Sequence, residues 1–348
     1  MTPTNVTPAS SAQARCAVII PTRDKLNFLK PCIESLLASN GAEQLQVIVV
    51  DNNSEETETL NYLTALAEQP NCSVLRWRQP FNFSAINNFA ARQCNADILC
   101  LLNNDVEITQ PDWLEKMLPL AERHDVGAVG CVLLYPDRSL QHAGIALDEL
   151  SIARHIAHAE PATYLADREV KAPYAVAAAT AACLFVRREL FLRLGGFNEE
   201  HLAVAYNDVD LCLRIGEKGL PILIEPAVSL VHHESVTRKQ DSLPDNRARA
   251  LAEHNYMLAR WRHRLAGQHY AKGLPADLLI ATSREQSALN DLVKRATDLL
   301  YQDVESVAEF TVVAPPPGPS GQGDANYWRH HYLSLESRME SQLESLQE

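Results

Sequence analysis

The sequence lacks the features that mark several broad classes of protein. It has no apolar run near the roughly 20 residues that a membrane-spanning helix requires. Its eight cysteines never form a Cys-x-x-Cys pair and several lie inside apolar runs, so we expect buried thiols in a reducing compartment and no disulfide or zinc framework. Basic residues number 31 against 44 acidic ones, and the formal net charge of -13 argues against nucleic-acid binding.

Two common nucleotide-binding signatures are also missing. The sequence contains neither the Gly-x-x-x-x-Gly-Lys-Ser/Thr phosphate loop nor the Gly-x-Gly-x-x-Gly turn, which excludes P-loop kinases and ATPases and dinucleotide-dependent dehydrogenases. The first residues, MTPTNVTPASSAQAR, contain no apolar segment, which predicts a polar leader and no signal peptide. We therefore expect a cytoplasmic protein.

What is present is an alternating pattern of strands and helices. With 348 residues, 46% of them hydrophobic, the chain can bury one large core or two modest ones. Short apolar runs alternate with helical patterns, which is typical of an α/β protein with a mainly parallel sheet flanked by helices. The expected strands are 16–21, 46–52, 73–78, 97–103, 127–136, 175–188 and 222–233. The expected helices are 26–39, 84–94, a segment after Pro111, 207–218 and 245–265.

This pattern stops after Gly267. We expect a disordered leader (1–14), an α/β domain (15–267), an accessory helical region (268–311), a Pro/Gly-rich linker (312–325) and a C-terminal helix (326–348). The last helix has an apolar stripe that it cannot bury alone, formed by Tyr332, Leu335, Met339, Leu343 and Leu346. The stripe predicts a coiled coil or a bound partner, with packing on the protein's own core or fraying as the alternative. It stops mid-repeat at Glu348, which favours a natural chain that continues.

Polar side chains follow two of the expected strands, at the edge where ligands bind in open α/β sheets. Asp51 ends one strand and can accept a hydrogen bond from a base or ribose, or else cap the next helix. Asn103, Asn104 and Asp105 follow another strand. Mg²⁺ and Mn²⁺ take oxygen ligands and commonly bridge carboxylates to phosphates, so Asp105 is a candidate ligand with Glu107 or Asn103 nearby. The alternative is an ordinary turn.

Two aspartates begin the expected helix 207–218. Asp210 lies four residues before Arg214, which predicts a structural ion pair. Asp208 has no cation at the corresponding helical positions, so it is the better candidate for a general base. The alternative is that Asp208 only caps the helix.

A histidine pair, His232 and His233, ends the last expected strand. Because neighbouring residues on a strand point to opposite faces, at most one of them is expected at a given site. That histidine could supply a nitrogen ligand to a cation held by Asp105. The His-Glu-x-x-His spacing of zinc proteases is absent.

Taken together, these segments resemble glycosyltransferase family 2, especially bacterial members that build O-antigen and other surface polysaccharides, rhamnosyltransferases among them. The resemblance runs through VIIPTRDK (18–25), VVDNNS (49–54), PFNFSAINNFAA (80–91), LLNNDVEI (101–108), QHAGIAL (141–147), ATAACLFVRRELFLRLGGFNE (179–199), YNDVDLCLR (206–214) and VHHESVTR (231–238). It covers roughly residues 15–265, and its ordered set of motifs is highly specific.

The resemblance implies a GT-A fold and an inverting, metal-dependent glycosyltransferase. Its donor would be a dTDP, UDP or GDP sugar, and its acceptor a glycan or lipid-linked glycan. The implied nucleotide-binding residues are Pro21, Thr22, Asp51, Asn82, Asn87, Asn103 and Asn104. Asp105, with either His232 or His233, would bind Mn²⁺ or Mg²⁺, and Asp208 would be the catalytic base.

The sequence departs from the family pattern at three positions, and two other functions remain alternatives. Asn103 stands where the family has the first acidic residue of its Asp-x-Asp motif, Asn207 replaces an acidic neighbour of the base, and Ala181 replaces a frequent glycine. Because of Asn103, one alternative is a catalytically weak or silent relative, which binds sugar nucleotides and acts as an assembly protein through its C-terminal helix. A nucleotidyltransferase is disfavoured, because PTRDK is not a Gly-rich basic loop.

Peripheral contact with the inner face of the cytoplasmic membrane is a further alternative. Arg260, Arg262 and Arg264 flank Trp261 near the end of the helix expected at 245–265. Such a group suits lipid phosphates. The competing interpretation is that these cations only complement the helix dipole.

Overall fold

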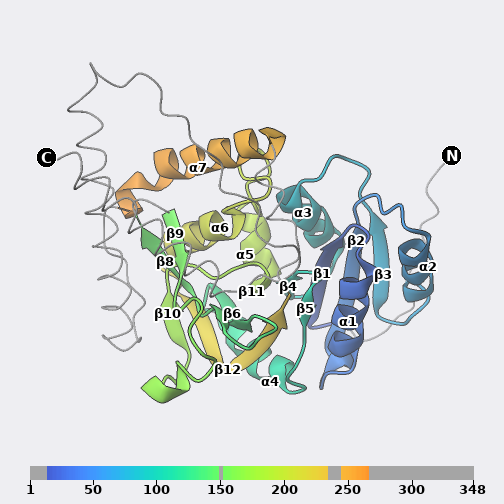
Figure 1. The fold of residues 1–348 in the computed structure, drawn as a ribbon, viewed down its shortest axis with the longest axis horizontal. Coiled ribbons are helices and arrows are strands. Elements are labelled where there is room, and N and C mark those ends of the chain that lie inside the picture. Colours follow the sequence, from blue (N-terminus) through green and yellow to red (C-terminus); the bar gives the residue numbers. More distant parts are fainter. Residues whose placement is uncertain (1–13, 149–151, 234–243, 266–348) are drawn as a thin grey trace, which may run out of the picture. The chain divides into compact units, whose positions relative to one another are not determined.

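The computed structural model describes residues 14–148, 152–233 and 244–265 (Figure 1). The chain divides into two compact units, residues 1–279 and 280–348, and every described residue lies in the first. The expected leader, accessory region, linker and C-terminal helix therefore lie outside the described residues and stay predictions. No helix in the described part is both long and apolar enough to span a bilayer.

The central sheet has the strand order β10-β12-β6-β11-β4-β1-β2-β3, with β5 paired to β12 and β7 to β6. Its strands are β1 (Cys16–Thr22), β2 (Leu45–Asp51), β3 (Cys72–Arg76), β4 (Ile98–Leu102), β5 (Val106–Glu107), β6 (Ala128–Leu134), β7 (Leu140–His142), β10 (Tyr174–Val176), β11 (Cys183–Arg187) and β12 (Ile222–His232). The pairs β3-β2-β1-β4 and β6-β12 are parallel, whereas β11 runs antiparallel between β4 and β6. A separate two-stranded ladder joins β8 (Ile145–Asp148) and β9 (Ile152–His155).

Helices pack on both faces of this sheet. They are α1 (Leu26–Leu37), α2 (Thr57–Leu66), α3 (Phe83–Gln93), α4 (Trp113–Ala121), α5 (Arg188–Arg193), α6 (Asn207–Gly216) and α7 (Pro244–Leu265). Alternate residues of β1 enter two separate apolar clusters, because successive side chains on a strand point to opposite faces. Ile19 belongs to the cluster that contains residues of α3, α5, α6 and α7, and Ile20 to the one that contains residues of α1, α2 and α4. Burial on both faces explains why these strands are continuous Val/Ile/Leu runs.

The structure corrects one expected strand. Residues 175–188 do not form a single strand but two, β10 and β11, which lie in different parts of the sheet. Between them, Ala178 forms an isolated antiparallel bridge with Ile145, and two later N–H groups face side chains. The Thr180 N–H faces His142 Nε2 at 3.4 Å, and the Ala181 N–H donates to Asp208 Oδ2 at 3.0 Å. An Ala-rich run alone could not reveal this break.

The thiols agree with the expectation from the sequence. All eight cysteines are unpaired, and all except the half-buried Cys72 are buried. Burial raises the pKa of Cys16 and Cys32 above the ordinary thiol value, so these groups stay protonated and inert.

Candidate active site

Parallel strands bring four of the expected nucleotide-binding residues to one edge of the sheet. Thr22 and Asp51 are partners at the carboxyl ends of β1 and β2, and both are buried beside the equally buried Pro21. Asn104, which follows β4, donates from Nδ2 to Thr22 Oγ1 at 2.9 Å. The carboxyl ends of β1, β2 and β4 therefore form one polar surface, as expected for a parallel sheet.

Asp51 already has protein partners. Its carboxylate accepts the Ser54 N–H at 3.1 Å and forms an ion pair with Arg76 at the end of β3. One oxygen thus fixes the turn after β2 but does not cap α2, which has Glu56 as its N-cap and no side-chain cap. The other oxygen is bound by a half-exposed guanidinium. Arg76 and Asp24, whose Oδ1 accepts the Glu55 N–H at 2.8 Å, were not among the expected site residues. Their only sequence signal was their position next to strand ends.

Helix α3 contributes two expected asparagines with different surroundings. Asn82 caps the helix, since its Oδ1 accepts the Ala85 N–H at 2.8 Å. Asn87 is fully buried and donates to the Phe83 carbonyl at 2.8 Å. Its Oδ1 has no hydrogen-bond partner within the part of the chain that the structure describes. A buried amide oxygen left in this way costs about 1–3 kcal/mol, which a donor group on a ligand would relieve.

The end of β12 meets the segment after β4. His232 Nε2 lies 3.1 Å from Asp105 Oδ1 and 3.3 Å from Asn103 Nδ2. On the other side of the ring, Nδ1 lies 2.5 Å from Gln141 Oε1, while Gln141 Nε2 donates to the His232 carbonyl at 3.3 Å. This orientation of Gln141 requires a proton on Nδ1. Nε2 is therefore the ring atom that faces Asp105, and the contact of Nδ1 with Gln141 orients the ring as a second partner orients a metal-ligating histidine.

The neighbouring His233 points elsewhere. Its Nε2 lies 3.3 Å from Glu107 Oε2, and its ring contacts that of Phe28 at a centroid distance of 5.7 Å. The His232 ring thus faces the Asp105 carboxylate, whereas His233 contacts Asp105 through its backbone N–H, which donates to the Asp105 carbonyl at 3.0 Å. The two rings point apart, in agreement with the alternation of side chains along a strand.

Asp105 and His232 fit a divalent cation only in partnership with a ligand. Together they offer one carboxylate oxygen and one imidazole nitrogen, a set that Mn²⁺ accepts. Within the described ranges, no group of three or more His, Cys, Asp or Glu side chains could hold a metal. A six-coordinate ion here would need phosphate oxygens and water for its other positions, which is the usual pattern for cations bound with nucleotides.

Asp208 lies in the first turn of α6 and is held by backbone groups. Its Oδ2 accepts the Ala181 N–H at 3.0 Å, and its Oδ1 accepts the Val209 N–H at 2.8 Å. The next residue of the same segment, Ala182, accepts the Asn103 N–H at 3.0 Å. A single dipeptide therefore connects the candidate base with the segment that carries Asp105.

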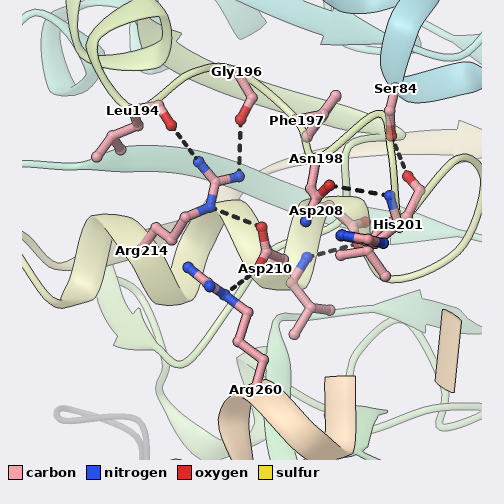
Figure 2. Close-up of polar contacts among 12 residues, drawn as sticks. Ser84, Leu194, Gly196, Phe197, Asn198, His201, Asp208, Asp210, Arg214 and Arg260 are labelled. Carbon is pink, nitrogen blue, oxygen red and sulfur yellow. Dashed lines mark hydrogen bonds and ion pairs between the residues drawn. The ribbon is translucent and has the colours of Figure 1, made fainter. Parts of the chain in front are cut away.

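Asp210 has a different environment, and the predicted ion pair with Arg214 is confirmed. Arg214 Nε donates to Asp210 Oδ2 at 2.7 Å, while its two other nitrogens donate to the carbonyls of Leu194 and Gly196. Figure 2 shows Arg214 and Arg260 converging on Asp210 from α6 and α7. Asp210 is fully buried, so its role is structural.

Replacing Asp210 with alanine should destabilise the fold by about 3 kcal/mol, because it leaves the largely buried Arg214 without its carboxylate. Urea unfolding followed by circular dichroism measures this change. Asp125→Ala is the control, since Asp125 pairs with Arg123 at the surface, and its midpoint should stay near the wild-type value. Equal midpoints for the two variants would contradict a structural role for the buried pair.

His142 makes stability depend on pH. Burial, followed by the nearby His155 and His232, holds the pKa of His142 well below its ordinary value of 6.5. Below that pH the unfolded chain binds a proton that the folded chain does not, so stability falls on acidification by up to about 1.4 kcal/mol per pH unit. His142→Gln should flatten the dependence of the unfolding free energy between pH 6.5 and 5, whereas His124→Gln, at an exposed position, should not. An unchanged slope in the His142 variant would refute this assignment.

Known proteins share the sequence motifs and the fold of this chain. The family model described as Glycosyl transferase family 2 matches residues 17–195. The O-antigen biosynthesis protein RfbC of Myxococcus xanthus is 37% identical over 241 residues, which are 66% of this chain and 18% of that protein. The uncharacterized protein y4gI of Sinorhizobium fredii is 41% identical over 263 residues, 74% of this chain and 29% of that protein. The chain thus spans less than a third of the length of either relative.

Two solved structures share the fold. The structure of GalNAc-T7 with UDP, GalNAc and Mn²⁺ superposes with a TM-score of 0.52 at 13% identity, covering 75% of this chain and 59% of that one. The structure of S. aureus TarS 1-349 in complex with UDP-GlcNAc gives a TM-score of 0.50 at 14% identity, covering 70% and 66%. At such identities the likeness concerns the fold alone, which is the GT-A fold expected above. With the matched family model and the ordered strand-end motifs, the chain belongs to glycosyl transferase family 2.

Proposed function

We propose that this protein is a metal-dependent, inverting glycosyltransferase that moves a sugar from a nucleotide diphosphate to a hydroxyl of a bacterial surface glycan. The observation that carries the proposal is the arrangement around Ala181 and Ala182. One side of this dipeptide binds the candidate base Asp208, and the other binds the segment of Asp105, which contacts His232. A base and a diphosphate-binding group on either side of one short segment suit a displacement at an anomeric carbon.

The residues of this chain then have separate tasks. Thr22, Asp51 and Asn104 line the nucleotide side, where buried Asn87 Oδ1 can accept a hydrogen bond from the donor. Asp105 and His232 would hold the cation, which would supply positive charge to stabilise the diphosphate leaving group. Asp208 takes the proton of the acceptor hydroxyl while its oxygen forms a bond to the anomeric carbon and the bond to the diphosphate oxygen breaks. Attack from the opposite face inverts the configuration in one displacement.

The relatives support the substrate classes. GalNAc-T7 was solved with UDP and Mn²⁺ and TarS with UDP-GlcNAc, which favours a nucleotide sugar and a divalent cation here. RfbC acts in O-antigen biosynthesis, which favours a glycan or lipid-linked acceptor at the inner face of the cytoplasmic membrane. Any membrane contact would depend on exposed side chains such as Arg262, because Trp261 is buried and Arg260 is paired with Asp210.

A donor-hydrolysis assay tests the proposal without knowledge of the acceptor. UDP-glucose, UDP-N-acetylglucosamine, dTDP-rhamnose and GDP-mannose are each incubated with the full chain in Mn²⁺ or in EDTA, and release of the nucleoside diphosphate is measured. At least one donor should be hydrolysed in Mn²⁺, and EDTA should suppress that rate. Full turnover in EDTA would contradict metal dependence.

One observation favours a catalytically silent relative as the second candidate. Asn103 Nδ2 lies 3.3 Å from His232 Nε2, so the amide can occupy the lone pair that a cation would need. Such a protein would bind nucleoside diphosphates without turning over any donor, and would act through its segment 326–348 in an assembly. Binding by isothermal titration calorimetry without hydrolysis of any donor would favour this candidate.

A further inference from the structure

Helix α7 lies outside the residues that match the family model, yet it contacts the segment that leads to the candidate base. We propose that α7 positions Asp208, and that Glu253 is the principal positioning residue. This inference rests on the proposed function, because it gives Asp208 the role of base. Three contacts of α7 and one strained residue carry it.

The first contact is a buried carboxylate that binds loop backbone. Glu253 is almost fully buried, and its Oε1 accepts the Val204 N–H at 2.8 Å. Its Oε2 accepts the Ala205 N–H at 3.2 Å and the Arg249 Nη1–H at 2.7 Å. A buried carboxylate is tolerated only when it is paired and hydrogen-bonded. Two of its three donors belong to the loop just before Asp208, so the helix and the loop depend on each other.

Two further contacts of α7 bind the chain before and after this loop. Tyr256 Oη accepts the Asn198 Nδ2–H at 2.8 Å, and its ring stacks on that of His201 at a centroid distance of 4.5 Å. Trp261 Nε1 donates to Asp210 Oδ1 at 3.0 Å on the other side of Asp208. Glu253 and Trp261 are two helical turns apart, about 12 Å along the helix axis. Helix α7 therefore holds the chain on both sides of the base.

The segment between these contacts contains backbone strain. Tyr206, two residues before Asp208, has φ 60° and ψ 3°, in the left-handed region that bulky residues avoid. A residue held in this region persists only where its surroundings over-determine the conformation. Here the surroundings include Glu253 on the preceding amides and His254, whose Nδ1 lies 3.4 Å from Tyr206 Oη.

The opposite side of the same loop is bound by α3. The Ser84 N–H donates to the Ala203 carbonyl at 3.1 Å, and the Ser84 hydroxyl donates to the Leu202 carbonyl. Helix α3 carries the expected nucleotide-binding residues Asn82 and Asn87. The loop 202–206 thus lies between the nucleotide side and α7, and its conformation sets where Asp208 stands relative to the donor.

Glu253→Gln tests the proposal in the full chain. The amide retains one acceptor oxygen, so the loop loses one of its two carboxylate contacts. We expect the kcat of donor hydrolysis to fall about 10-fold, with the KM of the same donor within twofold of wild type. Amide hydrogen exchange should become faster at residues 203–206. The matched control is Glu217→Gln, at an exposed position at the other end of α6. It should change neither the kinetic constants nor the exchange rate at residues 203–206.

Arg249→Ala is a second variant, which keeps both contacts of the carboxylate with the loop but removes the cation paired with it. It should lower kcat less than Glu253→Gln, again without raising KM. A wild-type kcat in Glu253→Gln would overturn the proposal. So would a rise in KM together with faster exchange throughout the protein, which is the signature of general destabilisation. A different result concerns the proposed function: if Asp208→Asn keeps wild-type turnover, the base assignment fails whatever Glu253→Gln does.

Discussion

Asp208→Asn is expected to lower turnover by about 10²–10⁴-fold, the usual contribution of a general base. Binding of the nucleoside diphosphate should stay within twofold of wild type, because the reason for the loss is proton removal and not donor affinity. The substituted amide can still accept the Ala181 N–H, which holds the carboxylate at 3.0 Å, so the loop should keep its conformation. Initial rates of hydrolysis and transfer, with binding measured by calorimetry, separate the two effects.

The matched control for this variant is Asp167→Asn, which changes an exposed carboxylate on a short 3-10 helix outside the site. Its rates should equal those of wild type. If Asp208→Asn kept wild-type turnover, another group would have to accept the proton. If it lost nucleotide binding as well, Asp208 would act on the donor and not on the acceptor.

Asp105→Ala should remove the response to Mn²⁺ and lower kcat/KM by about 10²–10³-fold, since a bound cation contributes several kcal/mol of charge stabilisation. Because Asp105 and His232 offer only two ligands, wild type should bind Mn²⁺ weakly alone and more tightly with a nucleoside diphosphate. The variant should lose this mutual enhancement. Calorimetric titration of Mn²⁺ with and without UDP, dTDP or GDP measures it.

Glu107→Ala discriminates between the two histidines. Glu107 contacts His233 just as Asp105 contacts His232, at nearly the same distance. If Asp105 and His232 bind the cation, Glu107→Ala should leave the response to Mn²⁺ intact. The reverse outcome, a loss in Glu107→Ala and none in Asp105→Ala, would move the site to His233.

Local sequence pattern predicted the bounds of most central strands. Continuous apolar runs predicted β1, β2, β4, β6 and β12 to within two residues at each end. The i, i+4 spacing predicted the ion pair of Asp210 with Arg214. These inferences succeed because strand alternation and helical periodicity act over a few residues and are therefore visible in the sequence. The break within 175–188 was missed, because the side chains of His142 and Asp208 that bind its backbone come from elsewhere in the chain.

The sequence by itself determined the α/β class, the order of the motifs and the presence of acidic residues and asparagines at strand ends. Only the tertiary structure decided that His232 meets Asp105 while His233 meets Glu107, that Gln141 orients the His232 ring, and that Glu253 binds the loop before Asp208. The physical reason is the separation of the contacting residues along the chain. Propensity and periodicity describe neighbours along the chain, whereas each of these contacts joins residues 48 to 127 positions apart. Such partners meet only after the sheet has formed, so no local pattern records them.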